Sequence, residues 1–115
     1  MIPISYVELT VLDLVSAKAF YAAAFDWTFN DYGPGYAGIR SADGDTEVGG
    51  LALGDVVTPG GPLVLLEADD LAATRHAIET AGGVAHELIA YPGGQRFEFT
   101  DPSGNRLGVF RSAHD

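Results

Sequence analysis

The sequence contains one pattern twice, 57 residues apart, and this duplication restricts the fold more than any other feature. In the first copy Val11-Leu12-Asp13-Leu14 leads into an alanine-rich stretch. In the second copy Ala68-Asp69-Asp70-Leu71 does the same, and Gly82-Gly83 follows. Because a period this long occurs only twice, it indicates duplication of one βαβββ unit and not a solenoid. The alternative is two similar units that arise from general α+β patterning.

The first unit opens with a predicted strand and helix. Residues 4–11 alternate in the way of a half-buried strand, with Val7, Leu9 and Val11 on one side and Tyr6, Glu8 and Thr10 on the other. Asp13 can accept hydrogen bonds from the free N–H groups of a helix that begins at Leu14. That helix carries a single apolar stripe, formed by Leu14, Ala17, Phe20, Tyr21, Ala24 and Phe25.

The rest of the chain repeats this plan. Gly82-Gly83 is expected to end a second helix over about 71–81, capped by Asp69 or Asp70. Further strands are expected at 27–32, 36–41, 47–53, 63–68, 84–91, 95–100 and 106–111. The predicted fold class is therefore α+β, with one domain over residues 1–115. It divides into a first module at about 1–55, a linker at about 55–62 and a second module at about 63–115.

Composition excludes several functions. The 115 residues are 47% hydrophobic and contain no cysteine, so one core can form while thiolate catalysis and Cys-based zinc sites are excluded. We identify no signal peptide and no membrane span, and expect a cytoplasmic protein without a membrane partner. The net charge of −10 disfavours nucleic acid as a partner and favours a cationic ligand. An acidic surface that only aids solubility is the alternative.

Three motifs follow one another along the chain. Residues 6–14 read YVELTVLDL, residues 17–21 read AKAFY with FDW at 25–27, and residues 101–105 read DPSGN. Together they resemble the glyoxalase/bleomycin-resistance/dioxygenase superfamily, also called vicinal oxygen chelate proteins, although Asp26 stands where glycine is common. The resemblance implies two βαβββ modules forming a curved mixed sheet around a cavity. This cavity is usually completed in a homodimer, sometimes by swapping modules between chains.

The resemblance also implies where metal ligands would stand. In metal-dependent relatives a His or Gln lies seven residues before the Asp of the first motif, but here Tyr6 and Leu63 hold those positions. Gly108 replaces the Glu that usually follows the D-P-x-G-N motif. Glu47 could ligate, but its alignment is uncertain because the hairpin differs in length. A divalent metal needs about three or four N or O ligands, so we expect no metal and no other cofactor. The histidines stand elsewhere, at His76, His86 and His114.

Strand alternation, combined with the resemblance, predicts the lining of the cavity. Comparison with related resistance proteins places Arg96 and Glu98 toward it. The expected ligand-binding residues are Tyr6, Glu8, Thr10, Leu65, Glu67, Arg96, Glu98, Arg106, Gly108 and Phe110. The alternative is that the arginines only form internal ion pairs with the acidic residues. Gly108 could leave room in the cavity, or mark close strand packing or a bulge.

Nearby aromatic residues are assigned by the same alternation. Phe97 and Phe99 face away from Glu98 and are expected in the core against the second helix. Trp27 and Tyr32 are expected as core or dimer residues, whereas Tyr36 could approach the cavity.

These features favour a metal-independent, homodimeric protein that binds a polar or cationic small molecule in the inter-module cavity. The alternative is a lactoylglutathione-lyase-like enzyme with an atypical metal or a carboxylate-based site, for which no catalytic residue can be assigned. A third possibility is a structural or regulatory dimer whose own side chains fill the cavity.

Overall fold

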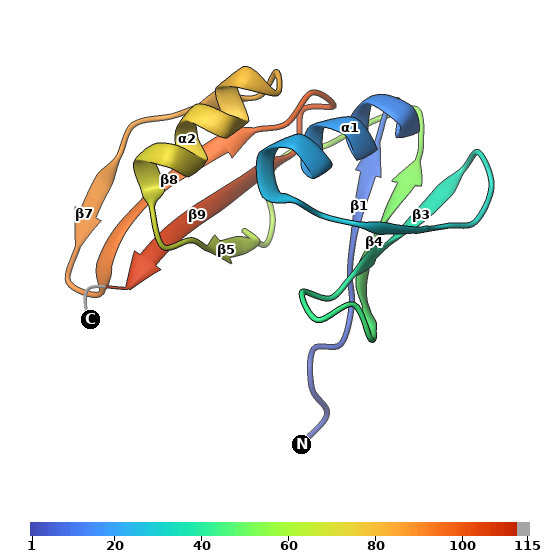
Figure 1. Ribbon diagram of the computed structural model, residues 1–115, viewed down its shortest axis with the longest axis horizontal. Coiled ribbons are helices and arrows are strands. Elements are labelled where there is room, and N and C mark those ends of the chain that lie inside the picture. Colours follow the sequence, from blue (N-terminus) through green and yellow to red (C-terminus); the bar gives the residue numbers. More distant parts are fainter. Residues whose placement is uncertain (113–115) are drawn as a thin grey trace.

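Two helices and two mixed β-sheets make up residues 1–112, the part of the chain that the computed structural model describes (Figure 1). In chain order the elements are β1 (Val7–Val11), α1 (Leu14–Phe25), β2 (Phe29–Asp31), β3 (Tyr36–Arg40), β4 (Glu47–Leu53), β5 (Leu65–Glu67), α2 (Leu71–Thr80), β6 (Val84–Ala85), β7 (Ile89–Tyr91), β8 (Gly94–Thr100) and β9 (Arg106–Ser112). Within residues 1–112, neither helix is long and apolar enough to cross a membrane.

Each sheet belongs to one copy of the repeated unit. The first sheet has the order β1-β4-β3-β2, and the second has β5-β9-β8-β6, with β7 also paired to β8. The first strand of each unit runs parallel to the last one, β1 to β4 and β5 to β9, and the other pairs are antiparallel. The predicted α+β fold with two βαβββ units is therefore confirmed. We call β1–β4 with α1 the first module and β5–β9 with α2 the second.

The helix boundaries follow from the predicted caps. The Asp13 carboxylate accepts a hydrogen bond from the Ser16 N–H at the start of α1, and Asp70 does the same for Ala73 at the start of α2. Asp26 ends α1 in the left-handed conformation, with φ of 59°. Aspartate is one of the few residues besides glycine that tolerates this conformation, which accounts for the departure from the family motif.

One apolar core joins the two modules, because α1 packs against α2, against β3 and β4 of the first sheet, and against Phe99 of the second sheet. The rings of Tyr21 and Trp27 stack at 4.5 Å. Phe97 and Phe99 are fully buried as predicted. The ring of Phe99 contacts those of Phe20 and Phe25 of α1, and Leu71 and Ile78 of α2 belong to the same buried cluster.

The DPSGN motif fastens the turn between β8 and β9 to the first module. Asp101 is almost fully buried, and its carboxylate accepts hydrogen bonds from the Tyr21 hydroxyl and from the backbone of Ser103 and Asn105. The Asn105 amide in turn donates to the Thr10 carbonyl at 2.7 Å. The motif therefore holds the two modules in a defined relation.

Several predicted strands are shorter than expected, and one is interrupted. The first strand begins at Val7, and the N-terminal end of the chain extends away from the sheets (Figure 1). The strand expected at 84–91 is divided, because Ala85 pairs with Phe99 but Ile89 pairs with Arg96. Between these two pairs, the 84–91 segment contains one residue more than the facing part of β8. Such an extra residue interrupts the hydrogen bonding between the two strands.

Candidate ligand-binding site

The outer face of the first sheet, opposite the core, is built around two glycines. Glu8, Gly50, Gly38 and Asn30 lie next to one another across β1, β4, β3 and β2. A Cβ atom on Gly38 would lie 2.0 Å from Glu47 Oε1, and one on Gly50 would lie 1.9 Å from the Tyr36 hydroxyl. The two glycines therefore leave the space in which longer neighbouring side chains meet.

Six side chains form a hydrogen-bonded group in that space. Glu47 accepts hydrogen bonds from the hydroxyls of Tyr6 and Tyr32, both at 2.7 Å, and from the Asn30 amide at 3.0 Å. The Tyr36 hydroxyl lies 2.9 Å from the Tyr6 hydroxyl and 3.0 Å from a Glu8 carboxylate oxygen. We call this group the tyrosine–glutamate cluster; its members are Tyr6, Glu8, Asn30, Tyr32, Tyr36 and Glu47.

A β-bulge brings Glu47 into the cluster. Ile39 pairs with Gly49, but the next residue, Arg40, pairs with Glu47, so Val48 is left over. Strict alternation from Gly49 would turn Glu47 toward the core face, and the extra residue turns it to the outer face instead. The bulge also explains why the position of Glu47 could not be aligned from sequence.

The cluster holds neutral phenols around an ionised carboxylate. The hydrogen bond from Tyr32 is the largest cause that lowers the pKa of Glu47, and those from Asn30 and Tyr6 add to it. The same bond with Glu47 raises the pKa of Tyr32, while the hydrogen bond with Tyr36 is the largest cause that raises the pKa of Tyr6. For Tyr36, the hydrogen bond with Tyr6 lowers the pKa, but burial and Glu8 together outweigh it, so the pKa is raised.

These residues do not fit a divalent metal. A phenol binds a metal well only as phenolate, and the pKa of Tyr6 is shifted away from that form. Both carboxylate oxygens of Glu47 already accept hydrogen bonds from the cluster. The remaining family positions, Leu63 and Gly108, supply no ligand atom from their side chains. Within residues 1–112, no three His, Asp or Glu side chains gather as a metal-binding group, and His114 lies outside the described residues.

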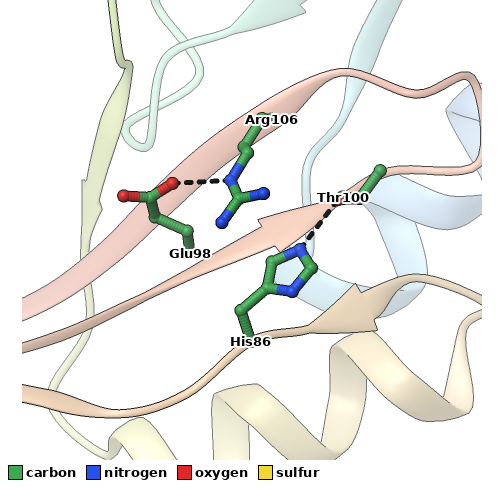
Figure 2. A network of polar contacts seen from close by, with 4 residues as sticks. All are labelled: His86, Glu98, Thr100 and Arg106. Atoms are coloured by element: carbon green, nitrogen blue, oxygen red, sulfur yellow. Dashed lines mark hydrogen bonds and ion pairs between the residues drawn. The ribbon is translucent and has the colours of Figure 1, made fainter. Parts of the chain in front are cut away.

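The outer face of the second sheet carries a different set of contacts. Arg106 Nε donates to Glu98 Oε1 at 2.6 Å, so these two residues form an ion pair. Beside them the His86 ring lies 2.9 Å from the Thr100 hydroxyl, as Figure 2 shows. Arg96 lies over the ring of Tyr91, 5.8 Å from its centre.

Gly108 allows close packing and not an open space. A Cβ atom on Gly108 would lie 2.5 Å from Leu65 Cδ2, so the Leu65 side chain covers the glycine. Leu65 pairs with Gly108 across β5 and β9, and Glu67 pairs with Phe110. Of the alternatives left open by the sequence, close packing is the one that the structure supports.

A separate cavity of about 780 Å³ lies between the two modules. Its apolar lining comes from the opposite sides of the strands, and includes Val7, Leu9, Ile39, Val64, Leu66 and Leu107. None of the predicted ligand-binding residues lines this cavity, so the expectation that they face the inter-module cavity is not met within one chain; they lie on the outer faces. Of these residues, Glu8 and Arg106 both line a smaller groove of about 250 Å³ beside residues 58–60. Binding of a ligand by the outer-face residues stays a prediction.

The structure therefore gathers Tyr6 and Glu8 in one cluster, and Glu98 and Arg106 in one ion pair. Thr10 lies on the same outer face as Glu8 but is not a member of the cluster. Asn30 was not among the expected site residues, and Tyr32 was expected in the core or in a dimer contact. Both lie on β2 or just after it, and their alternate spacing was the available signal.

Family comparison agrees with this architecture. The model of the Glyoxalase/Bleomycin resistance protein/Dioxygenase superfamily matches residues 4–109. The chain therefore belongs to this superfamily. No curated protein shows a significant sequence match to the chain.

Several solved structures share the fold. A glyoxalase-related enzyme from Fulvimarina pelagi superimposes with a TM-score of 0.80 at 20% identity, covering 97% of this chain and 89% of its own. TnmS3, an antibiotic binding protein from Streptomyces sp. CB03234, gives a TM-score of 0.73 at 22% identity, with 98% of each chain covered. The bleomycin-binding protein from Streptomyces verticillus, complexed with copper(II)-bleomycin, gives 0.66 at 19% identity, covering 100% of this chain and 98% of its own. At these identities the likeness establishes the fold alone.

Proposed function

We propose that this chain is a metal-independent small-molecule-binding protein of the glyoxalase/bleomycin-resistance type, with a polar or cationic ligand bound at its outer faces. The observation that carries the proposal is the tyrosine–glutamate cluster. Tyr6 stands where the family resemblance places a metal ligand, and its hydroxyl donates to the carboxylate of Glu47. Hydroxyls, carboxylates and aromatic rings grouped on one surface are suited to a polar ligand.

The exposure of the cluster supports binding over a structural role. The Tyr6 side chain is 40% exposed and that of Tyr32 is 59% exposed. Large aromatic residues that form hydrogen bonds at an open surface contribute little to the core, and they are available to a ligand or a second protein surface. Two antibiotic-binding proteins of the same fold make a binding function the simplest extension.

We further propose that a homodimer completes the site, in the cytoplasm. Apolar side chains of the second module that lie outside the core include Leu65, Leu88, Ile89 and Tyr91. A second copy would bury them. Light scattering of the purified protein at several concentrations tests the dimer, and a constant monomer mass would refute it.

Metal analysis tests the proposed function against an enzyme with an atypical metal. Protein purified without chelator is analysed by inductively coupled plasma mass spectrometry, and then screened by thermal shift against divalent metals, metabolites and antibiotics. We expect substoichiometric metal, no stabilisation by metals, and a raised melting temperature with at least one organic compound, because a ligand that binds only the native state stabilises it. About one tightly bound metal per chain would contradict the proposal and favour the enzyme.

A further inference from the structure

The tyrosine–glutamate cluster has more oxygen–oxygen contacts than protons to fill them. Four contacts join hydroxyl and carboxylate oxygens: Tyr6 to Glu47 at 2.7 Å, Tyr32 to Glu47 at 2.7 Å, Tyr36 to Glu8 at 3.0 Å and Tyr6 to Tyr36 at 2.9 Å. Each phenol carries one proton and an ionised carboxylate carries none. Three hydroxyl protons therefore serve four contacts.

The missing proton can be assigned to one place in the cluster. Tyr6 and Tyr32 direct their protons to the two oxygens of Glu47. The single proton of Tyr36 can then serve either Tyr6 or Glu8, but not both. If it serves Tyr6, no side chain of residues 1–112 donates to the Glu8 carboxylate; if it serves Glu8, no proton lies between the two hydroxyl oxygens. One additional donor beside Tyr36 and Glu8 would remove the conflict.

We propose that the cluster binds an organic cation with an N–H donor, a primary ammonium or guanidinium group, placed against Glu8 and Tyr36. This inference rests on the proposed function and names the class of ligand for the same site. An ammonium or guanidinium N–H supplies the missing proton together with a positive charge. A quaternary ammonium ion supplies only the charge.

The charges around the cluster favour a cation. Within residues 1–112, neither Glu8 nor Glu47 forms an ion pair with a basic side chain. Arg40 pairs with Glu47 across β3 and β4, but its guanidinium donates to the Gly44 carbonyl at 3.0 Å. Two carboxylates thus share one exposed surface without a counter-charge, and a bound cation would neutralise them.

The aromatic rings provide the remaining contacts. The Tyr32 and Tyr36 rings lie 6.1 Å apart at an angle of 50°, so two aromatic rings stand side by side on this surface. A cation above such rings is attracted by their negative faces. Gly38 and Gly50 form the floor of this region, and their lack of side chains leaves room for those of Glu47 and Tyr36. Charge, aromatic surface and a missing donor occur together on one sheet face.

Four probes that share one benzyl group separate the contributions. Benzylamine and benzylguanidine carry charge and N–H donors, benzyltrimethylammonium carries charge alone, and benzyl alcohol is neutral. Affinities are measured by isothermal titration calorimetry at neutral pH and low salt, with binding mapped by amide chemical shifts. We expect the two N–H cations to bind at least about tenfold more tightly than either other probe.

Variants of the cluster locate the binding. Glu8→Gln removes the charge and brings its own N–H donor to Tyr36, so the cluster becomes complete without a ligand. We expect this variant and Tyr36→Phe to lose at least about tenfold in affinity for benzylguanidine while keeping the melting temperature of the parent. The matched control is Glu79→Gln, which removes one carboxylate from the exposed end of α2 and should bind as the parent does.

The outcomes distinguish this inference from the proposed function. Equal affinity for benzyltrimethylammonium and benzylamine, or unchanged affinity in Glu8→Gln, would overturn the inference. If the thermal-shift screen nevertheless finds a neutral or anionic ligand, the proposed binding function stands without it. If neither the probes nor the screen yields a ligand, both fail.

Discussion

Two tyrosine–carboxylate hydrogen bonds of equal length occur in very different surroundings. Tyr21 donates to Asp101 at 2.7 Å inside the core, where Tyr21 is 0% and Asp101 4% exposed. Tyr32 donates to Glu47 at the same distance on a surface where Tyr32 is 59% exposed. A buried carboxylate depends on its donors, whereas an exposed one can exchange them for water or a ligand. The same bond therefore stabilises the fold in one place and is available for binding in the other.

The sharpest test of this contrast is the pair Tyr21→Phe and Tyr32→Phe. Each removes one hydroxyl and little volume. We expect Tyr21→Phe to lower the free energy of unfolding by about 2–3 kcal/mol, because a hydrogen bond to a buried charged group is lost. Tyr32→Phe should leave the urea midpoint within error of the parent. Equilibrium urea unfolding followed by circular dichroism measures both, and similar losses in the two variants would contradict the distinction.

Neighbouring glycines on β4 extend the comparison to the backbone. A Cβ atom on Gly49 would lie 2.3 Å from the Val7 carbonyl oxygen, so β1 and β4 would have to move apart. We expect Gly49→Ala to destabilise by about 1–2 kcal/mol, since overpacking against backbone cannot relax easily. In Gly50→Ala the new methyl meets only the end of the Tyr36 side chain, which can rotate away.

The matched glycine variants therefore differ in what they damage. Gly50→Ala should fold with nearly the parent urea midpoint but lose affinity for benzylguanidine, because Tyr36 no longer occupies its place. Gly49→Ala should show the lower urea midpoint. A Gly50→Ala variant that retained full affinity would show that the glycine floor is not needed for binding.

The fold could be predicted from the sequence because its signals are local. Asp13 and Asp70 mark the helix starts, and the alternation of Val7, Leu9 and Val11 marks the buried side of a strand. The cluster could be predicted only in part. The bulge at Val48 moves Glu47 to the outer face of the sheet, and no residue type in the sequence marks the position of that bulge. The lining of the inter-module cavity depends on how the two modules pack against each other. Strand alternation divides the side chains between the two faces of each sheet, but it does not say which faces enclose the cavity.

The exposed ion pair of the second sheet should contribute less than the buried bond. The side chains of Arg106 and Glu98 are 46% and 25% exposed. We expect Arg106→Gln to change the free energy of unfolding by about 0.2–1 kcal/mol, because solvent screens exposed pairs. Urea unfolding at low and high salt checks this, and the effect should shrink with added salt. A loss as large as that of Tyr21→Phe would show that the pair is buried in the assembled protein, as a dimer interface over this face requires.

The smallest expected effect is the pH dependence that Glu47 confers. The pKa of Glu47 is lowered in the folded protein, chiefly by the Tyr32 hydroxyl, so the folded state favours the carboxylate more than the unfolded state does. The resulting stabilisation is present above the unfolded pKa of about 4.3 and is lost as the pH falls through the folded value. The difference in urea midpoint between the parent and Glu47→Gln should therefore be constant from pH 7 to 5 and shrink toward pH 3. Glu79→Gln is the control of equal charge. A difference in urea midpoint between the parent and Glu47→Gln that persists unchanged at pH 3 would mean that the Glu47 side chain acts through packing and not through its charge. The cluster would then resemble the buried Tyr21–Asp101 pair more than its exposure suggests.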